Sequence, residues 1–375
     1  MIDMPTKRLF LREWHPFDGG SADIRFSDTI KYSEDIVIDN DRGIAIISFD
    51  PGRSEWNTVM GIFRDPNPKG SLYIYDYAAT GTIKKLVLTD TIDFHPVGIN
   101  FFRNSPQSKT RLFVANHQRT GTTVAVFDID YDLYQAKYIT TVFDNNETIV
   151  SPNSIAPVSY TQFYVTNDHH YLARTRPLLS KIETYFSMPW GWVTFVDFSS
   201  TEHQIVATNI SFANGIVMTP TGKEVIVASS GHDAVYIYQR DSETNSLSGT
   251  HETVHVNFDH SLDISDPTVF DADGRFLRGL TVGGHPSIIK LVQAVHNPES
   301  VKAPSWVAEI RRGAGVDPAP CPAAPQQPKF YARTLYQSNG EHFSTSTTGA
   351  LDSKRGRLLV ASLYGKGILD ISWKV

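Results

Sequence analysis

Short apolar runs recur along the chain, and each of them is closed by Gly, Asp, Asn or Pro. Runs such as IVIDNDRGIAIISF, RLFVANH, TVAVFDID, QFYVTND, GWVTFVDF and KEVIVASS are rich in β-branched and aromatic residues, which suit the half-buried surface of a β-sheet. Helical periodicity is nearly absent. The exception is residues 176–188, where Leu179, Ile182, Tyr185 and Phe186 recur at three- and four-residue spacing. The pattern predicts an all-β protein with one short helix.

The strands form a repeat when they are aligned by the residues that precede them. Each unit has a small turn residue, an apolar strand, a polar turn, and a second apolar strand that ends in Ala or Thr and a polar residue. The units are VGINFF…KTRLFVANH, NSIAPVSYTQFYVTND, NGIVMTPTGKEVIVASS, DPTVFDADGRFLRG, TGALDSKRGRLLVASL and EDIVIDNDRGIAIISF. The spacing of the first three, roughly 55 to 60 residues, falls in the broad range of propeller blades. The sequence predicts a six-bladed β-propeller with a central channel.

The length of 375 residues exceeds the usual size of one domain unless the fold is a barrel, solenoid or propeller. It fits either one large all-β domain or two ordinary domains. A propeller favours the first choice, because each blade packs on its neighbours and the ring needs no second core. We expect one domain over residues 1–375, with an N-terminal extension at 1–30 and a Pro- and Ala-rich loop insertion at 294–328.

Charge and composition exclude several classes of partner. The chain has 34 basic and 40 acidic residues without a basic stripe, so nothing in it would follow a nucleic-acid backbone. No apolar run reaches the ~18 to 20 residues of a transmembrane segment, and the start MIDMPTKRLFLREW is too charged for a signal peptide. The sequence leaves the oligomeric state open.

Two sequons and one cysteine bear on the cellular location. Asn146 and Asn209 lie in acceptor sequons for N-glycosylation. The single cysteine, Cys321, allows no intrachain disulfide and does not indicate a compartment. We expect the secretory pathway or the extracellular space, with a cytoplasmic location as the alternative.

One place in the repeat, directly before the first strand of each unit, is occupied mostly by polar residues. The innermost strand of a propeller blade starts near the central channel, so these residues converge on a common axis. They are Glu34, Asp35, Val97, Asn153, Ser154, Asn214, Asp266, Pro267 and Thr348. Taken singly, Asn and Asp beside Gly are turn formers. Their recurrence at one place instead favours a calcium site with two carboxylates and two amide oxygens, Glu34, Asn153, Asn214 and Asp266.

Several segments together resemble the paraoxonase and arylesterase group, six-bladed propellers that are related to gluconolactonases and strictosidine synthases. The segments are SEDIVI, FHPVGI, LFVANH, FYVTNDH, FANGIVMTPTGKEVIV, DPTVFDADG, GGHP and GRLLVASL. The resemblance implies a tunnel with two calcium ions. The catalytic ion would take the four residues named above, although Pro267 replaces a family asparagine. The structural ion would take Asp35 and the Ile99 carbonyl, although Ser154 replaces a family aspartate.

The histidines depart further from this group. The resemblance implies a water-activating histidine at the position of Val97 in HPVGIN, and a valine cannot accept a proton. His117 in VANHQ matches a second family histidine and would act as the base or as an orienting partner. His169 in TNDH and His285 in GGHP also match, as catalytic candidates or as structural residues bonded to loop carbonyls.

An aromatic segment aligns with the helix that walls the active site in the group. Its members Tyr185, Phe186, Trp190 and Trp192 would offer apolar faces to a small lipophilic substrate. Packing within a blade is the alternative for the two tryptophans.

Two chemical interpretations follow. The first is a non-hydrolytic enzyme of secondary metabolism that forms bonds on lipophilic carbonyl substrates, by cyclisation, condensation or a cycloaddition such as a hetero-Diels–Alder step. The relation of this group to strictosidine synthases supports it, because they too carry an aliphatic residue at the position of Val97, although they do not need the calcium-type residues Glu34, Asn153, Asn214 and Asp266. The alternative is a calcium-dependent lactonase or arylesterase, in which His117 would activate water. A non-catalytic propeller would not need converging metal-type ligands.

Overall fold

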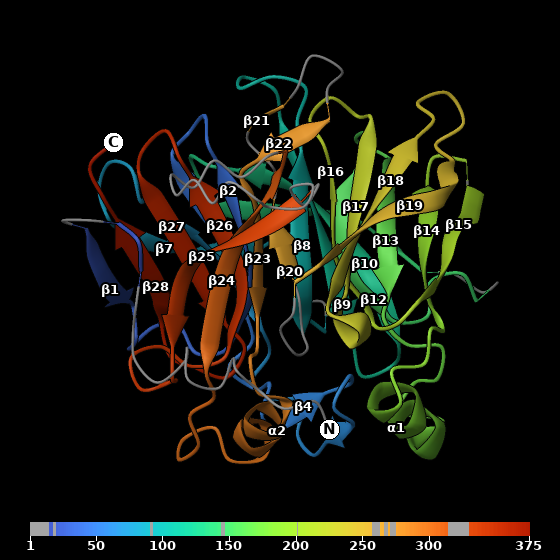
Figure 1. The fold of residues 1–375 in the computed structure, drawn as a ribbon, viewed down its shortest axis with the longest axis horizontal. Helices are drawn as coiled ribbons and strands as arrows, with labels where there is room; N and C mark the ends of the chain where they lie inside the picture. The colour runs from blue at the N-terminus through green and yellow to red at the C-terminus, as the bar shows by residue number, and fades with distance from the viewer. Residues whose placement is uncertain are drawn as a thin grey trace, which may run out of the picture.

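The computed structural model describes residues 15–17, 20–90, 93–143, 147–200, 202–256, 263–265, 269–270, 275–313 and 330–375. Upright antiparallel sheets stand side by side in a propeller-like arrangement (Figure 1). Within the described ranges there are four four-stranded sheets, one eight-stranded sheet and two two-stranded hairpins. The prediction of an all-β, propeller-like fold is confirmed.

The four-stranded sheets each follow the chain from one strand to the next, except that the last sheet includes the first strand of the chain. In sheet order they are β12 (Pro152–Pro157), β13 (Gln162–Asn167), β14 (Gly191–Asp197) and β15 (Glu202–Ile210); β16 (Ala213–Met218), β17 (Glu224–Ser229), β18 (Ala234–Arg240) and β19 (Leu247–His255); β20 (Asp263–Ser265), β23 (Leu280–Gly284), β24 (Ser305–Arg312) and β25 (Phe330–Ser338); and β26 (Ser346–Asp352), β27 (Arg357–Ser362), β28 (Ile368–Ser372) and β1 (Ser21–Arg25).

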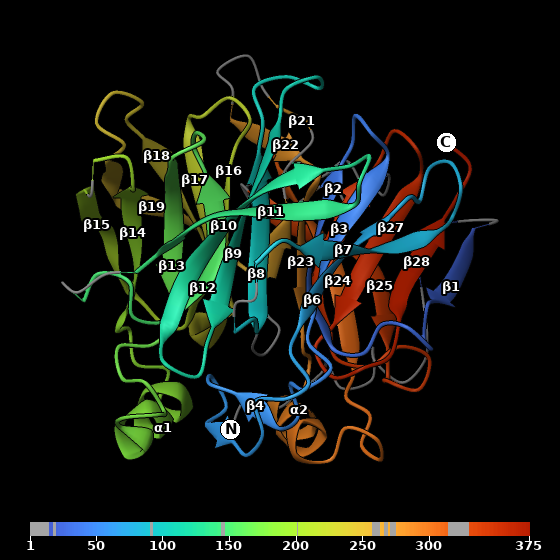
Figure 2. The same cartoon turned by 180° about the vertical axis from the view of Figure 1, so that it is seen from behind.

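The eight-stranded sheet consists of two four-stranded halves. Its strands in sheet order are β2 (Ser33–Asp39), β3 (Ile44–Phe49), β6 (Ser71–Tyr75) and β7 (Ile83–Leu88), then β11 (Gln135–Val142), β10 (Thr122–Asp130), β9 (Thr110–His117) and β8 (Pro96–Phe102). The halves meet where β11 reaches across to β7 and pairs with it in parallel at Gln135↔Val87 and Ala136↔Leu88 (Figure 2). Hydrogen bonding therefore gives five larger sheets, whereas the repeat predicted six.

The apolar core lies between neighbouring sheets. Ile226 and Ile237, from the sheet of β16–β19, pack with Val282 and Trp306 from the next sheet, and all four are almost fully buried. A sheet that is buried on both faces needs apolar side chains on both, and for this reason the strands of this sequence are continuous β-branched runs. Burial of such side chains stabilises each of them by about 1.5–3 kcal/mol.

The N-terminal extension predicted at residues 1–30 contains a strand of the last sheet. β1 pairs antiparallel with β28, from Ser21↔Ser372 to Arg25↔Ile368. This strand was missed in the sequence because SADIR is short and has no apolar run, and in the structure it is mostly exposed. The pairing joins the two ends of the chain within one sheet.

Residues 294–328, predicted as a loop insertion, include the end of α2 (Ile288–His296) and one strand. β24 (Ser305–Arg312) lies inside this range and is buried over most of its length. The strand was missed in the sequence because Pro and Ala residues on both sides of it indicated a loop. Residues 314–329, which include Cys321, lie outside the described residues.

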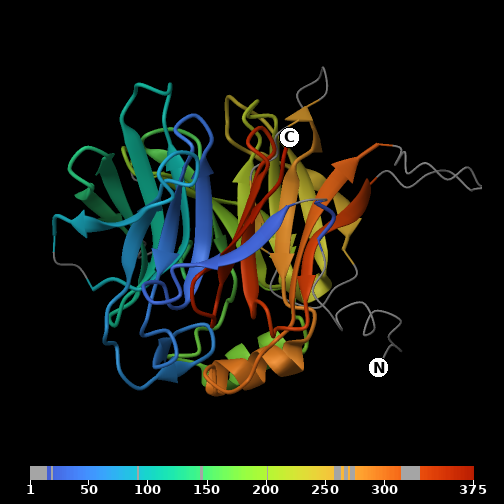
Figure 3. The same cartoon turned by 90° about the vertical axis from the view of Figure 1, so that its left-hand side faces the viewer.

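Two helices and one hairpin cover the same end of the sheets (Figures 1 and 3). They are α1 (Pro177–Tyr185), α2 (Ile288–His296) and the hairpin of β4 (Trp56–Asn57) and β5 (Ile62–Phe63). α1 lies where periodicity predicted it, but α2 was missed. Leu291 and Val295 of α2 pack against Ile62 of the hairpin and Tyr364. Within the described ranges, neither helix is long and apolar enough to cross a membrane.

The remaining hairpin consists of β21 (Val269–Phe270) and β22 (Phe276–Arg278). In Figure 1 it lies at the end of the sheets opposite the two helices. It takes no part in the cavity described below.

Candidate functional site

The same irregularity occurs near the start of five inner strands, β2, β8, β12, β16 and β26. In each strand the antiparallel register shifts over the first four residues. Two residues lie within each shift, namely Glu34–Asp35, Val97–Gly98, Asn153–Ser154, Asn214–Gly215 and Thr347–Thr348. A β-bulge re-aims the side chains that it contains. These bulges place corresponding residues of five inner strands, which belong to four sheets, around one axis.

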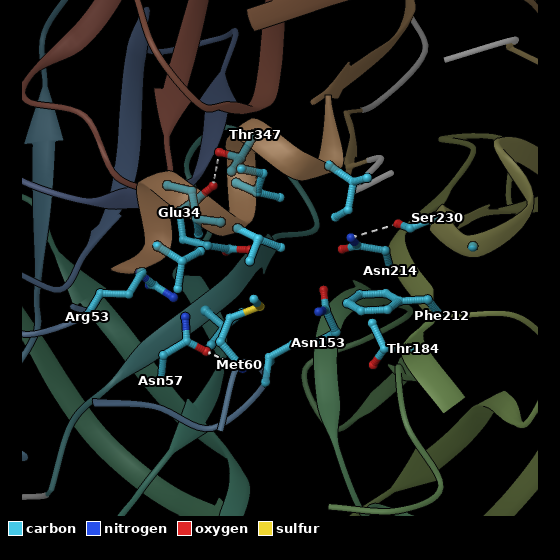
Figure 4. A pocket seen from close by; sticks show the side chains of 18 of the residues that line it. Glu34, Arg53, Asn57, Met60, Asn153, Thr184, Phe212, Asn214, Ser230 and Thr347 are labelled. Atoms are coloured by element: carbon cyan, nitrogen blue, oxygen red, sulfur yellow. Dashed lines mark hydrogen bonds between the residues drawn. The ribbon is translucent and has the colours of Figure 1, made fainter. Parts of the chain in front are cut away.

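The first residue of each pair lines one cavity of about 630 Å³, which we call the main cavity. Its polar lining consists of Glu34, Arg53, Asn57, Asn153, Thr184, Asn214, Ser230, Gln293 and Thr347. Apolar walls come from the hairpin loop, from Val97 and Phe212, and from the Ile288 to Val295 face of α2. The main cavity therefore combines a group of oxygen-bearing side chains with a largely apolar surround (Figure 4).

Close contact between neighbouring inner strands fixes this arrangement. A Cβ atom added to Gly98 would lie 2.3 Å from the Asn153 carbonyl oxygen, and one added to Gly283 would lie 1.4 Å from the Thr347 carbonyl oxygen. Both distances are far below a normal contact, so these positions require glycine. The positions of Asn153 and Thr347 depend on these glycines.

Hydrogen bonds orient both asparagines of the main cavity. Asn153 Nδ2 donates to Asp168 Oδ2 at 3.0 Å, and Asn214 Nδ2 donates to Ser230 Oγ at 3.0 Å. The amide nitrogens are thereby engaged at the rim, and both amide oxygens face the cavity (Figure 4). Thr347 Oγ1 donates to the backbone carbonyl of Glu34 and links that strand to β26.

These three side chains fit a calcium ion. Calcium takes carboxylate and amide oxygens and completes its sphere with water or further oxygens, and Glu34, Asn153 and Asn214 supply such oxygens around one cavity. The described residues contain no group of three His, Cys, Asp or Glu side chains suited to a metal, because this set has one carboxylate and two amides. Asp266 and Pro267 lie outside the described residues.

The second predicted calcium set does not fit. Asp35 accepts hydrogen bonds from Ile36 N at 2.7 Å, Ile99 N at 2.7 Å and Thr348 Oγ1 at 2.8 Å. Its carboxylate is fully buried, and burial raises its pKa to about 6. Three donors already occupy the oxygens, and Ser154 adds no charge. These residues lie by a separate cavity of about 40 Å³ lined by Asp35, Ile99 and Ser154.

His117 is buried and does not line the main cavity. Its Nε2 lies 2.7 Å from the Pro152 carbonyl oxygen, and its Nδ1 lies in hydrogen-bond contact with Thr58 Oγ1. Since only Nε2–H can donate to the carbonyl, Nδ1 accepts from the Thr58 hydroxyl. Burial lowers the pKa of His117, which favours this neutral form. Both ring nitrogens are thus engaged away from the main cavity.

His169 reaches the main cavity through another side chain. Its Nδ1 lies 2.8 Å from Asp168 Oδ1, and its Nε2 lies 2.7 Å from the hydroxyl of Thr184, which lines the cavity. Burial opposes the charge on His169, but the Asp168 carboxylate outweighs it and raises the pKa of His169. Burial likewise opposes the charge on Asp168, yet His169 and Asn153 lower the pKa of Asp168. His285 is buried and lies outside the lining.

The predicted aromatic wall is only partly present. Tyr185 lines the main cavity, although 68% of it is exposed. Phe186 and Trp190 are also exposed but are not among the lining residues. Trp192 is buried, and its Nε1 donates to the Thr148 carbonyl at 2.9 Å. Trp192 therefore packs within a sheet, which is the alternative that the sequence left open.

Several lining residues were missed by the sequence analysis. Arg53 lies in the turn segment after β3, Asn57 is the last residue of β4, and Phe212 directly precedes β16. The apolar positions of α2 were hidden in a short run that periodicity does not distinguish from a strand. The DPGR turn at residues 50–53 offered the best signal, because a charged residue there follows a strand of the repeat.

Of the two sequons, only Asn209 can be placed. It lies on β15 with an exposed side chain and a backbone φ of 63°. Asn146 lies outside the described residues.

The sheets are arranged around an axis, and their bulged inner strands line a cavity that two helices cover. These features define a class of propeller-like β-protein with a cavity at one end. Comparison with known proteins identifies the family. The family model described as arylesterase matches residues 58–369. The chain therefore belongs to the arylesterase family, and the resemblance to the paraoxonase and arylesterase group is confirmed.

Similar sequences include two human proteins. Serum paraoxonase/arylesterase 1 of Homo sapiens is 26% identical over 344 residues, which cover 90% of this chain and 84% of the relative. Serum paraoxonase/arylesterase 2 of Homo sapiens is 27% identical over 282 residues, which cover 74% of this chain and 69% of the relative. At this level of identity, individual site residues can differ between relatives.

Two solved structures share the fold. The luciferin-regenerating enzyme aligns with a TM-score of 0.52 at 13% identity and covers 94% of this chain and 95% of its own. The pyranose dehydrogenase PQQ domain of Coprinopsis cinerea aligns with a TM-score of 0.54 at 11% identity and covers 96% and 97%. These likenesses concern the fold alone.

Proposed function

We propose that this protein is a bond-forming enzyme that binds a small lipophilic carbonyl compound in the main cavity. The reaction class is cyclisation, condensation or cycloaddition, including a hetero-Diels–Alder step in natural-product assembly. The observation that carries this proposal is Val97, which occupies the inner-strand position next to Asn153 and gives the cavity an aliphatic group where water activation needs a base. His117 does not replace that base, because both of its ring nitrogens are engaged elsewhere.

The residues of the cavity support such a reaction. Val59, Met60 and Phe212 form apolar walls that exclude water and hold hydrocarbon parts of the substrate. Confinement of two reacting groups between these walls lowers the entropic part of the barrier. A calcium ion held by Glu34, Asn153 and Asn214 would supply a Lewis acid for a carbonyl oxygen. Thr184, in the last turn of α1, adds a polar oxygen to the lining, and its hydroxyl proton is donated to the Ser180 carbonyl at 3.0 Å.

Ester or lactone hydrolysis is the second candidate. Membership of the arylesterase family favours it, and so does Glu34, whose carboxylate lines the cavity beside the two amides. In that case Glu34 would accept the proton of an attacking water, since no described histidine lines the cavity.

The Val97→His variant separates the two candidates. Assays would follow hydrolysis of phenyl acetate and a panel of lactones, with calcium and with chelator. We expect little turnover by the wild type, and a gain of at least about tenfold in Val97→His if the missing base is what limits hydrolysis. Val87→His, at an exposed valine, is the matched control and should give no gain.

Two results would contradict the proposal. The first would contradict bond formation itself, and the second would contradict the role of Val97 in the cavity. Robust calcium-dependent turnover by the wild type would replace the proposal with a hydrolase. An equal gain in Val87→His would show that the effect does not arise in the cavity. No gain in either variant, with calcium still bound, would show that the cavity as a whole has departed from hydrolysis, and would direct the search to two-component substrates.

The number of blades and the location also belong to this proposal. We infer that the two halves of the eight-stranded sheet act as two blades, because only two residue pairs join them, so the ring has six.

The exposed side chain of Asn209 is accessible to glycosylation, which supports a location in the secretory pathway.

A further inference from the structure

A buried arginine lines the main cavity without an ionic partner. Arg53 follows β3, is 5% exposed and extends toward the cavity beside Asn57 (Figure 4). Its Nη2 donates to the Pro96 carbonyl at 2.8 Å. Its Nε is buried and has no hydrogen-bond partner. Within the described residues, no carboxylate lies within ion-pair distance of this guanidinium.

The acidic residues on either side of Arg53 in the chain, Asp50 and Glu55, already have partners, and Glu55 pairs with Arg64 at 3.5 Å. Asp50 Oδ2 lies 3.0 Å from His95 Nδ1, and Asp50 Oδ1 accepts from Gly52 N at 3.0 Å. His95 is itself buried. The turn that positions Arg53 therefore uses its own carboxylate to hold His95 and the backbone, and leaves the guanidinium directed into the cavity.

A buried charge without a partner is unfavourable, so proteins normally pair it or use it. A guanidinium has five N–H donors in a planar fork that matches two oxygens sharing a delocalised negative charge. An apolar surround strengthens such a contact, because the local dielectric is low. The main cavity supplies that surround, with Val97 and Met60 among its walls.

We propose that Arg53 is the recognition group for an anionic oxygen pair of the substrate. The substrate class is then a lipophilic carbonyl compound that also carries a delocalised oxyanion, such as a carboxylate or an acidic enol. This inference rests on the proposed function, because it assigns the substrate class of the same cavity. It applies equally to a bond-forming enzyme and to a hydrolase.

Binding of two probes that share a naphthyl group, one with an anionic oxygen pair and one neutral, tests the inference. Isothermal titration would compare 2-naphthoate with its neutral counterpart 2-naphthamide on the full chain, both with calcium and with EDTA. We expect the wild type to bind 2-naphthoate at least about tenfold more tightly than 2-naphthamide. Arg53→Gln should abolish this preference, and Arg53→Lys should retain part of it, because a lysine keeps the charge but not the planar fork.

Two further variants make the result specific. Arg64→Gln removes the same charge from an exposed arginine and should leave the preference unchanged. Arg53→Met keeps the aliphatic stem and replaces Arg53→Gln if that variant does not fold, as judged by thermal unfolding.

Three outcomes would overturn the inference. They are no preference for 2-naphthoate in the wild type, an equal loss in Arg64→Gln, or a preference that persists in Arg53→Gln and disappears with EDTA. The last outcome would place the anion on a bound cation instead. Because binding needs no turnover, failure here is distinguishable from failure of the proposed reaction.

Discussion

At the residue scale, one position of the repeat carries different chemistry from one inner strand to the next. Glu34, Asn153 and Asn214 present oxygens at the bulge, whereas Val97 presents methyl groups at the corresponding place. Fixed partners at the rim, Asp168 and Ser230, turn both amide oxygens into the cavity. The side chains thus share one backbone geometry but present different chemical groups, so a valine at this position changes the lining of the cavity without changing the fold.

Removal of the Glu34 charge tests the calcium site. Glu34→Gln should weaken calcium binding by about tenfold or more, because carboxylate charge sets much of the affinity of an oxygen-ligand site. Asn214→Ala should also lower metal content, by removing one ligand oxygen. Calcium titration and elemental analysis measure both, and thermal unfolding with and without calcium measures the linked stability.

Glu55→Gln is the matched control, since Glu55 forms a salt bridge at the surface. Metal content that stays at the wild-type value in both Glu34→Gln and Asn214→Ala would rule out this calcium site.

At the element scale, a β-bulge recurs near the start of five inner strands. Three of these strands are entered through a non-glycine residue with positive φ, at Tyr32 (64°), Phe212 (50°) and Thr345 (56°). Residues in this conformation are strained and tend to occur near functional sites. Each lies two positions before the residue that lines the cavity. The strain and the bulge together turn the second residue of the strand inward.

Gly98→Ala should disturb the site through the backbone. An added Cβ would lie 2.3 Å from the Asn153 carbonyl oxygen, so β8 and β12 must separate. We expect a loss of about 1–3 kcal/mol in the free energy of unfolding together with weaker calcium binding. Gly121→Ala is the control, because an added Cβ meets nothing within 4 Å there. Equal stability of the two variants in urea titration would contradict this account of the close contact.

At the scale of the whole molecule, the sheets form a ring whose two ends meet. β1 supplies the outer strand of the sheet that β26–β28 begin, so the first described strand of the chain holds the last one. Phe17 adds to this closure by stacking on Trp373 at 3.8 Å between ring centroids. The pairing covers the edge of β28 with β1, and it links the stability of the first and last described strands of the chain.

Deletion of residues 1–25 should therefore destabilise the entire ring. The deletion removes β1 and exposes the edge of β28, and we expect a decrease in Tm on the order of 10 °C. A deletion of residues 1–14 is the control. If both deletions lower the Tm equally in calorimetry, the effect does not arise from the β1–β28 pairing.

The sequence alone determined much of this protein. The short β-branched and aromatic runs predicted an all-β fold and their repeat predicted a propeller, because strand patterns depend on local side-chain burial. The repeat placed Glu34, Asn153 and Asn214 at one position, and the structure brings them to one cavity. The loss of a histidine at Val97 was also visible directly, since residue identity does not depend on folding.

Other features were decided only by tertiary structure. β1 was inconspicuous because its stability comes from pairing with β28, hundreds of residues away in the chain. α2 and Arg53 belong to no periodic motif, and they reach the cavity only because the ring brings distant segments to the same end. His117 looked like a base in the sequence, but the Pro152 carbonyl and Thr58 occupy its nitrogens. A sequence specifies which chemical groups are present, whereas only the folded structure decides which neighbours form hydrogen bonds with them.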